Sequence, residues 1–113
     1  MSNRTRIVTD EDLEKALDWL RDSAKEIGDA KANVVRTGHM IKHVKALTMK
    51  AFNELPASHQ EREALASAAY REALENDALA AGAYETLKSL REAAALKIET
   101  WRSEQANYRA LRI

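Results

Sequence analysis

The sequence contains a single proline, Pro56, and the segments on both sides of it carry long helical patterns. Because proline lacks an amide hydrogen and its ring clashes with the preceding turn, a helix that reaches Pro56 must end there. The short stretch from Leu55 to Ser58 then joins two helices, as between antiparallel neighbours. The sequence therefore predicts an all-α fold: an antiparallel hairpin of two long helices, at about residues 10–53 and 59–110. We expect residues 1–8, with Arg4 and Arg6, to form a flexible arm and residues 9–113 a single helical domain.

A seven-residue repeat marks the first predicted helix. Its members are Leu13, Leu20, Ile27, Val34 and Ile41, and the intermediate positions are filled by Leu17, Ala24, Gly38 and Val44 or Lys45. A repeat sustained over this length predicts coiled-coil-like packing against another helix. Gly28 and Gly38 each cost about 1 kcal/mol relative to alanine, so they mark either a bend or break, or a close approach of helices.

The second predicted helix carries a stripe of small and apolar side chains. They are Ala69, Ala73, Ala80, Ala83, Leu87, Leu90, Ala94, Ile98, Trp101 and Tyr108, in steps of mostly three and four. The stripe keeps its phase across Glu75, Asn76 and Asp77, which predicts a continuous helix at this weak point and at Gly82.

Caps are predicted at the starts of both helices. Thr9 precedes Asp10, Glu11 and Asp12, whose carboxylates are favoured in a first turn by the helix dipole. Ser58 and Glu61 have the spacing of a capping box, so we expect the second helix to begin at Ser58.

Alanine accounts for 21 of the 51 hydrophobic residues, and it contributes little transfer energy when buried. The core of one hairpin is therefore expected to be thin.

Trp19 lies about 120° around the helix from the line of Leu13 and Leu20, at 100° per residue. It is either a surface side chain that packs locally or part of a second apolar edge that contacts another molecule. We take the second interpretation and predict a homodimer that forms a four-helix bundle, or a higher oligomer. The predicted interface residues are Trp19, Tyr84, Leu96, Trp101 and Tyr108, with Tyr70 and Leu79 also beside the stripe.

Charge alternates along the chain although the net charge is zero. Residues 10–29 hold eight acids and three bases, a net charge of −5, and residues 30–53 hold five bases and no acid, a net charge of +5. Residues 54–77 hold six acids and two bases, −4, and residues 78–113 hold six bases and four acids, +2. A hairpin folded at Pro56 sets opposite charges beside each other, which favours the antiparallel arrangement.

Several classes of function are disfavoured. The chain has no cysteine, which excludes disulfides and thiolate metal sites, and it has no apolar run long enough for a membrane span or a secretory signal. His39 and His43 have metal-ligand spacing, but no acid between Asp29 and Glu54 completes a site. We therefore expect a cytoplasmic protein that is not an enzyme, with no metal, no cofactor and no membrane contact.

The alternative function is nucleic-acid binding through Lys31, Arg36, Lys42, Lys45 and Lys50, with the run Trp101, Arg102, Tyr108, Arg109 and Arg112 as a further aromatic and basic segment.

Three segments carry a resemblance to known proteins: residues 16–22 (ALDWLRD), 40–46 (MIKHVKA) and 101–110 (WRSEQANYRA). They are similar to a group of short uncharacterised helical proteins of tailed bacteriophages and prophages. The resemblance implies a non-structural accessory role in an infected or lysogenic bacterial cell, near replication, recombination or host-defence functions. Together with the expected apolar edge, it predicts a protein that acts by binding a host or phage protein.

Overall fold

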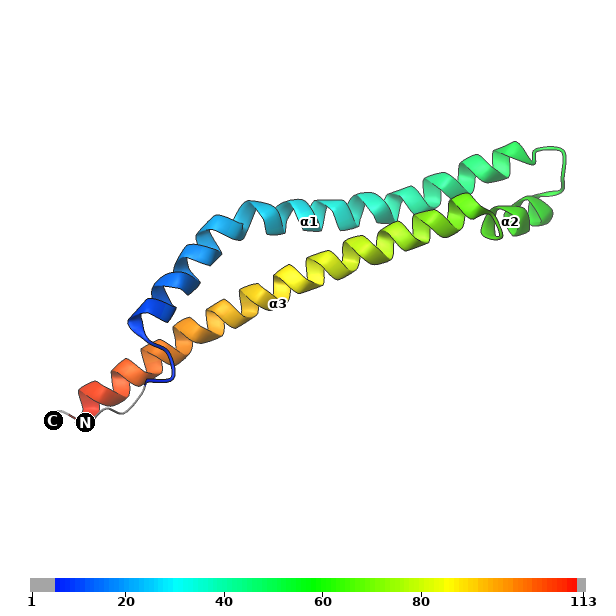
Figure 1. Cartoon of the computed structure of the whole chain (residues 1–113). Helices are drawn as coiled ribbons and strands as arrows, with labels where there is room; N and C mark the ends of the chain where they lie inside the picture. Colours follow the sequence, from blue (N-terminus) through cyan, green and yellow to red (C-terminus); the bar gives the residue numbers. More distant parts are fainter. Residues whose placement is uncertain (1–5, 112–113) are drawn as a thin grey trace. The chain divides into compact units, whose positions relative to one another are not determined.

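The computed structural model describes residues 6–111 and contains three helices and no strand in that range. The helices are α1 (Asp10–Ala51), α2 (Ala57–Leu65) and α3 (Ala68–Leu111), labelled in Figure 1. The predicted all-α class and the two long helices are confirmed. None of the three helices combines the length and the apolar character that a membrane crossing needs, for the residues searched.

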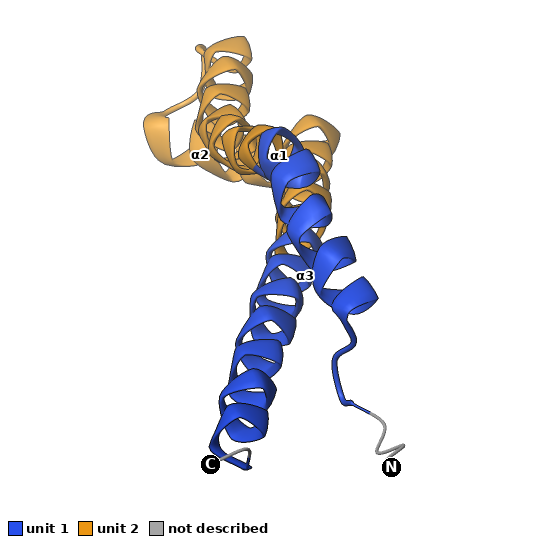
Figure 2. Cartoon of the chain, turned by 90° about the vertical axis from the view of Figure 1, so that its left-hand side faces the viewer, with its two compact units in different colours: residues 1–27, 86–113 blue, residues 28–85 orange. Residues whose placement is uncertain are grey.

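The chain divides into two compact units, which Figure 2 shows in different colours. Unit 1 contains residues 1–27 and 86–113, and unit 2 contains residues 28–85. Each unit therefore combines part of α1 with part of α3, and unit 2 also contains α2. The division on α1 falls immediately before Gly28, yet α1 is helical without interruption through Gly28 and Gly38.

The glycines do not mark a close approach of helices. A Cβ atom added at Gly28, Gly38 or Gly82 would meet no atom within 4 Å. The interpretation of Gly28 and Gly38 as contact points is therefore wrong, because both positions border open space. Helix α3 also continues through Glu75, Asn76 and Asp77, as predicted.

The start of α1 has the expected cap. The amide N–H of Asp12 donates to Thr9 Oγ1 at 3.0 Å, and the amide N–H of Thr9 donates to Asp12 Oδ2 at 3.1 Å. This reciprocal pair is a capping box, and it lowers the pKa of Asp12, first through the backbone hydrogen bond from Thr9 and then through the Thr9 hydroxyl.

The segment after Pro56 differs from the prediction. Pro56 itself stands before the first residue of α2, with φ −57° and ψ 153°, and makes no side-chain cap. Ser58 is already inside the helix, so the predicted capping box of Ser58 and Glu61 is wrong. The Glu61 carboxylate instead accepts from Lys45 Nζ at 3.1 Å, which ties α2 to α1 within unit 2.

The predicted second helix is divided into two at Ala66 and Ser67. Ser67 Oγ accepts from the amide N–H of Tyr70 at 3.1 Å and donates to the carbonyl oxygen of Ala64 at 2.7 Å. One hydroxyl therefore caps the start of α3 and satisfies a terminal carbonyl of α2. The predicted single helix over residues 59–110 is therefore wrong, because this range contains α2 and α3. The break at Ser67 lies eight residues before Glu75, the predicted weak point.

Small residues line α1 where it packs. The line of Leu13, Leu20, Ile27, Val34 and Ile41 is buried or half-buried, as predicted, but the second line contains Ala16, Ser23, Ala30, Thr37 and Val44. Leu17 is 49% exposed, and Ala24 is exposed too, so their assignment to the packed face is wrong. Both choices lie three or four residues from the same leucines, and the structure turns Ala16 and Ser23 inward in place of Leu17 and Ala24.

The packed face of α3 matches the predicted stripe at most positions. Ala73, Ala80 and Ala94 are buried, and Leu87, Ile98, Trp101 and Tyr108 are half-buried, whereas Ala69, Ala83 and Leu90 are exposed. No large side chain in the described part of the chain is fully buried. The packed faces are therefore thin, as the alanine content predicts.

The first residues described pack in unit 1. Val8 is buried, and the carboxylate of Glu104 accepts from the amide N–H groups of Val8 at 2.9 Å and Ile7 at 3.1 Å. Ile7 and Val8 therefore do not belong to a free arm such as the sequence predicts for residues 1–8. Arg4, like the rest of residues 1–5, and Arg112 lie outside the described residues.

The role of Ser67 is tested by comparing Ser67→Ala with Ser58→Ala. Loss of the cap hydroxyl at Ser67 is expected to lower the free energy of unfolding by about 1 kcal/mol, and Ser58→Ala by a few tenths. Urea titration followed by circular dichroism at one fixed protomer concentration measures both values. An equal loss in the two variants would contradict the assignment of the break.

Candidate functional site

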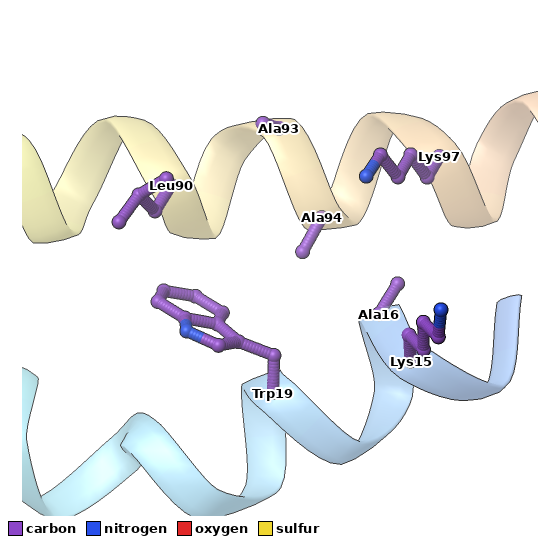
Figure 3. Close-up of a pocket in the computed structure, with 7 residues that line it drawn as sticks. All are labelled: Lys15, Ala16, Trp19, Leu90, Ala93, Ala94 and Lys97. Atoms are coloured by element: carbon purple, nitrogen blue, oxygen red, sulfur yellow. The ribbon is translucent and has the colours of Figure 1, made fainter. Parts of the chain in front are cut away.

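A shallow groove in unit 1 is the candidate interaction site (Figure 3). It lies between α1 and α3 and has a volume of about 270 Å³. Lys15, Ala16 and Trp19 line it from α1, and Leu90, Ala93, Ala94 and Lys97 line it from α3. Most of its surface is apolar, so it can accept an apolar side chain from another molecule.

Trp19 provides the largest side chain in this groove. Its indole ring extends from α1 toward α3, where Leu90 and Ala94 extend toward α1 (Figure 3). The ring fits because Ala94 and Ala16 are small, and it remains half-buried, while Leu90 is 48% exposed. The Ser23 hydroxyl donates to the backbone carbonyl of Trp19, which satisfies the one buried polar side chain of α1. An aromatic ring held in this way presents a rigid apolar surface at low entropic cost.

Two ammonium groups border the groove on its opposite rims. Lys15 lies on the α1 rim and forms an ion pair with Glu11 at 3.3 Å. Lys97 lies on the α3 rim, and both lysines contribute to lowering the pKa of Asp12 after the stronger effects of Thr9 and despite desolvation. The rims therefore favour an apolar side chain that has a carboxylate beside it.

The structure distributes the other predicted interface residues over both units. In unit 1 the Trp101 Nε1–H donates to Asp10 Oδ1 at 2.9 Å, and the guanidinium of Arg6 lies over the Tyr108 ring, 5.1 Å from its centroid. Leu96, also in unit 1, is 67% exposed. In unit 2 the ammonium of Lys31 lies 5.2 Å from the centroid of the Tyr84 ring. Trp101, Tyr108 and Tyr84 thus have partners within their own units, and their intermolecular roles stay predictions.

The basic segment of α1 lies in unit 2, and part of it is engaged there. Lys31 contacts Tyr84, Lys45 pairs with Glu61, and the Arg36 guanidinium donates to the side-chain oxygen of Asn33 at 3.3 Å. Lys42 and Lys50 are exposed. Only a part of the predicted nucleic-acid site is therefore directed entirely to solvent.

Metal-ligating side chains do not gather at this groove, within the part of the chain that was searched. Among the described residues, no group of three or more His, Asp or Glu side chains is close enough to hold a metal ion. His39 and His43 are both exposed on α1. The Trp19 groove is therefore suited to bind apolar and acidic groups.

Sequence reasoning missed the groove although it identified its main residue. Trp19 was expected at an edge because of its angle on α1, and Leu90 and Ala94 were expected on the stripe of α3. Which residues of α3 lie opposite Trp19 depends on the register between the two helices. No single-helix pattern reports that register.

Comparison with known proteins gives no relative: no family model, no curated protein and no solved structure matches this chain.

Proposed function

We propose that this chain is a non-enzymatic protein-interaction module, built as an antiparallel helical hairpin that dimerises and binds a further protein. The resemblance of residues 16–22, 40–46 and 101–110 to phage and prophage proteins supports an accessory role in the cytoplasm of an infected or lysogenic bacterium. The partner is then a host or phage protein of replication, recombination or host defence.

Contacts within each unit support antiparallel pairing. In unit 2, Lys31 lies over Tyr84, and the Thr37 hydroxyl donates to Asp77 Oδ1 at 2.7 Å. In unit 1, Asp10 accepts from Trp101, and Trp19 lies beside Leu90 and Ala94. In both units the residue numbers on α3 fall as those on α1 rise, which is the order that antiparallel neighbours produce.

The observation that carries the proposal is the distribution of apolar side chains. Within residues 6–111, five of the seven buried hydrophobic residues are alanines. Thirteen larger hydrophobic residues of the same range are exposed, including Leu17, Met40, Leu79, Leu90 and Leu96. Scattered exposed leucines are ordinary on a protein surface, but here they exceed the larger side chains that are buried. Apolar flanks of this extent are typical of surfaces that bind another protein or another copy.

The oligomeric state is the first test. Light scattering on the purified chain at micromolar concentration is expected to give twice the formula mass of 12.7 kDa. A monomer at all concentrations up to the millimolar range would refute the dimer. The circular dichroism spectrum of the same sample checks that the chain is helical, so that loss of folding is not mistaken for a monomer.

The Trp19 groove is tested by a matched pair of substitutions, Ala93→Glu and Ala95→Glu. Both alanines are exposed on α3, but only Ala93 lines the groove. A carboxylate at position 93 covers the apolar surface and stands four residues before Lys97, whose ammonium it can pair with, so we expect it to reduce capture of an apolar and acidic partner at least tenfold, a cost of about 1.4 kcal/mol or more. Capture from lysate of a bacterial host, quantified by mass spectrometry, is the measurement. Equal capture by the two variants would show that the partner binds elsewhere.

Nucleic-acid binding is the second candidate, favoured by one observation. Helix α1 contains five basic residues and no acid between Ala30 and Ala51. Because α2 and the start of α3 add acids to the same unit, we expect no shift of duplex DNA or RNA in a gel even at about 50 mM salt, where phosphate contacts are strong. A shift that disappears on doubling the salt and in Lys42→Glu with Lys50→Glu would instead support the alternative.

A further inference from the structure

The Trp19 groove of unit 1 has an apolar end and a cationic end. From one end to the other, its lining runs from Trp19 to Lys15 on α1 and from Leu90 to Lys97 on α3. Figure 3 shows the indole ring and Leu90 toward one end and both lysines toward the other. The groove therefore orients an occupant that has an apolar group at one end and an anionic group at the other.

The two ends are one to two helical turns apart. Trp19 and Lys15 are separated by four residues, or about 6 Å along α1, and Leu90 and Lys97 by seven residues, or about 10 Å along α3. Lysine carries its ammonium group on a flexible four-carbon stem, so both ammonium groups can reach back toward the apolar end. An apolar group and a carboxylate about 6 Å apart can thus contact both ends at once.

Both lysines are accessible to an anion. Lys97 is exposed on α3. Lys15 forms an ion pair with Glu11 at 3.3 Å, but the two side chains are 73% and 76% exposed, and ion pairs at such positions contribute little. Asp12 also interacts with both lysines, but its carboxylate accepts from the amide N–H of Thr9 at 3.1 Å. A carboxylate of another molecule can therefore replace Glu11 at Lys15 and approach Lys97 at the same time.

The size of the groove favours a side chain of a larger molecule over a small-molecule ligand. Its volume of about 270 Å³ lies below the range of about 300–1,000 Å³ that is typical of small-molecule pockets. Leu90 is 48% exposed and Ala93 is exposed, so the apolar surface continues from the groove onto the flank of α3. A protein partner can place one apolar side chain in the groove and cover this flank with its neighbours.

The walls of the groove favour a helical partner. Both α1 and α3 are uninterrupted where they line it, so their backbone groups are bonded within each helix. An extended peptide that adds to a sheet gains affinity from main-chain hydrogen bonds, which these walls do not offer. A helix bonds its own backbone groups and presents residues four apart on one face, about 6 Å along its axis. This spacing equals the separation of Trp19 and Lys15.

We propose that the Trp19 groove binds an amphipathic helix of the partner protein, with a large apolar residue against Trp19 and Leu90 and a glutamate or aspartate one turn away against Lys15 and Lys97. This inference rests on the proposed function, because it names the recognition element of the protein that the groove binds.

The test is a chemical-shift titration of the full chain, labelled with nitrogen-15, with two synthetic peptides. Each peptide is alanine-rich, about 20 residues long so that it is helical in water, and contains one leucine and one glutamate. In the first peptide these two residues are four apart and share a face, and in the second they are two apart and do not. Because composition and charge are identical, a difference in binding reports the spacing.

The two indole N–H signals show where a peptide binds. Trp19 lines the groove, whereas Trp101 lies outside it and donates its N–H to Asp10. We expect the first peptide, at millimolar concentration, to shift the Trp19 signal and to leave the Trp101 signal unchanged. Its dissociation constant is expected to be several-fold lower than that of the second peptide.

A charge reversal tests the role of the ammonium groups. Lys97→Glu is compared with Arg91→Glu, the same change at an exposed residue of α3 that does not line the groove. We expect Lys97→Glu to reduce several-fold the preference for the first peptide over a leucine–lysine peptide of the same spacing, and Arg91→Glu to keep that preference. Circular dichroism of each variant checks folding.

Several results would overturn the inference. Equal binding of the two peptides would show that the spacing plays no part, and an equal preference in the two variants would exclude the ammonium groups. If sodium dodecanoate shifts the Trp19 signal and neither peptide does, the groove binds a free amphiphile instead. Loss of the dimer in Ala93→Glu would assign the groove to a second copy.

Failure of this inference can be told apart from failure of the proposed function. An unchanged Trp19 signal with the first peptide refutes the helical partner, but the interaction module stands if Ala93→Glu still reduces capture of a protein from lysate relative to Ala95→Glu. If capture is also equal in those two variants, the groove is not the binding site and both proposals for it fail.

Discussion

The contact of α1 with α3 is lined by small side chains, and this constraint governs the rest of the structure. Ala16, Ser23 and Ala94 in unit 1, and Ala73 and Ala80 in unit 2, are buried where larger side chains would hold the helices apart. Burial of a methyl group contributes about 0.8 kcal/mol, compared with about 1.5 to 3 kcal/mol for a leucine or valine side chain. The helices can approach closely at such positions, but each one contributes little. Larger apolar residues such as Leu17 and Met40 are therefore left exposed on the flanks.

Small residues at seven-residue spacing also specify register weakly, because a slip by two turns exchanges Ala73 with Ala80 on α3 and Ala16 with Ser23 on α1. Polar and aromatic pairs supply the missing specificity in each unit. In unit 2 the Thr37 hydroxyl donates to Asp77, and a slip would leave a half-buried carboxylate without this partner. In unit 1 the carboxylate of Glu104 receives the amide N–H groups of Ile7 and Val8. A polar residue in a helix contact fixes register in the same way in coiled coils.

The sequence predicted the features that depend on one helix at a time. The line of Leu13, Leu20 and Ile27, the Thr9 cap and the continuity through Asn76 all follow from spacing and local chemistry. The failures concern choices between two nearly equal residues. Ser58 and Ser67 can each cap a helix, and the backbone at Pro56 decides between them by starting α2 before Ser58. The Trp19 groove could not be predicted, since it depends on which residues of α3 lie opposite Trp19 of α1.

The charges on the flanks decide what can cover the exposed apolar groups. An apolar groove alone attracts any hydrophobic surface, so its selectivity must come from the charged groups at its rims. In the Trp19 groove both rims end in ammonium groups, and a second copy would repeat that charge. A partner that carries a carboxylate beside an apolar side chain therefore suits this groove better than another copy of the chain does.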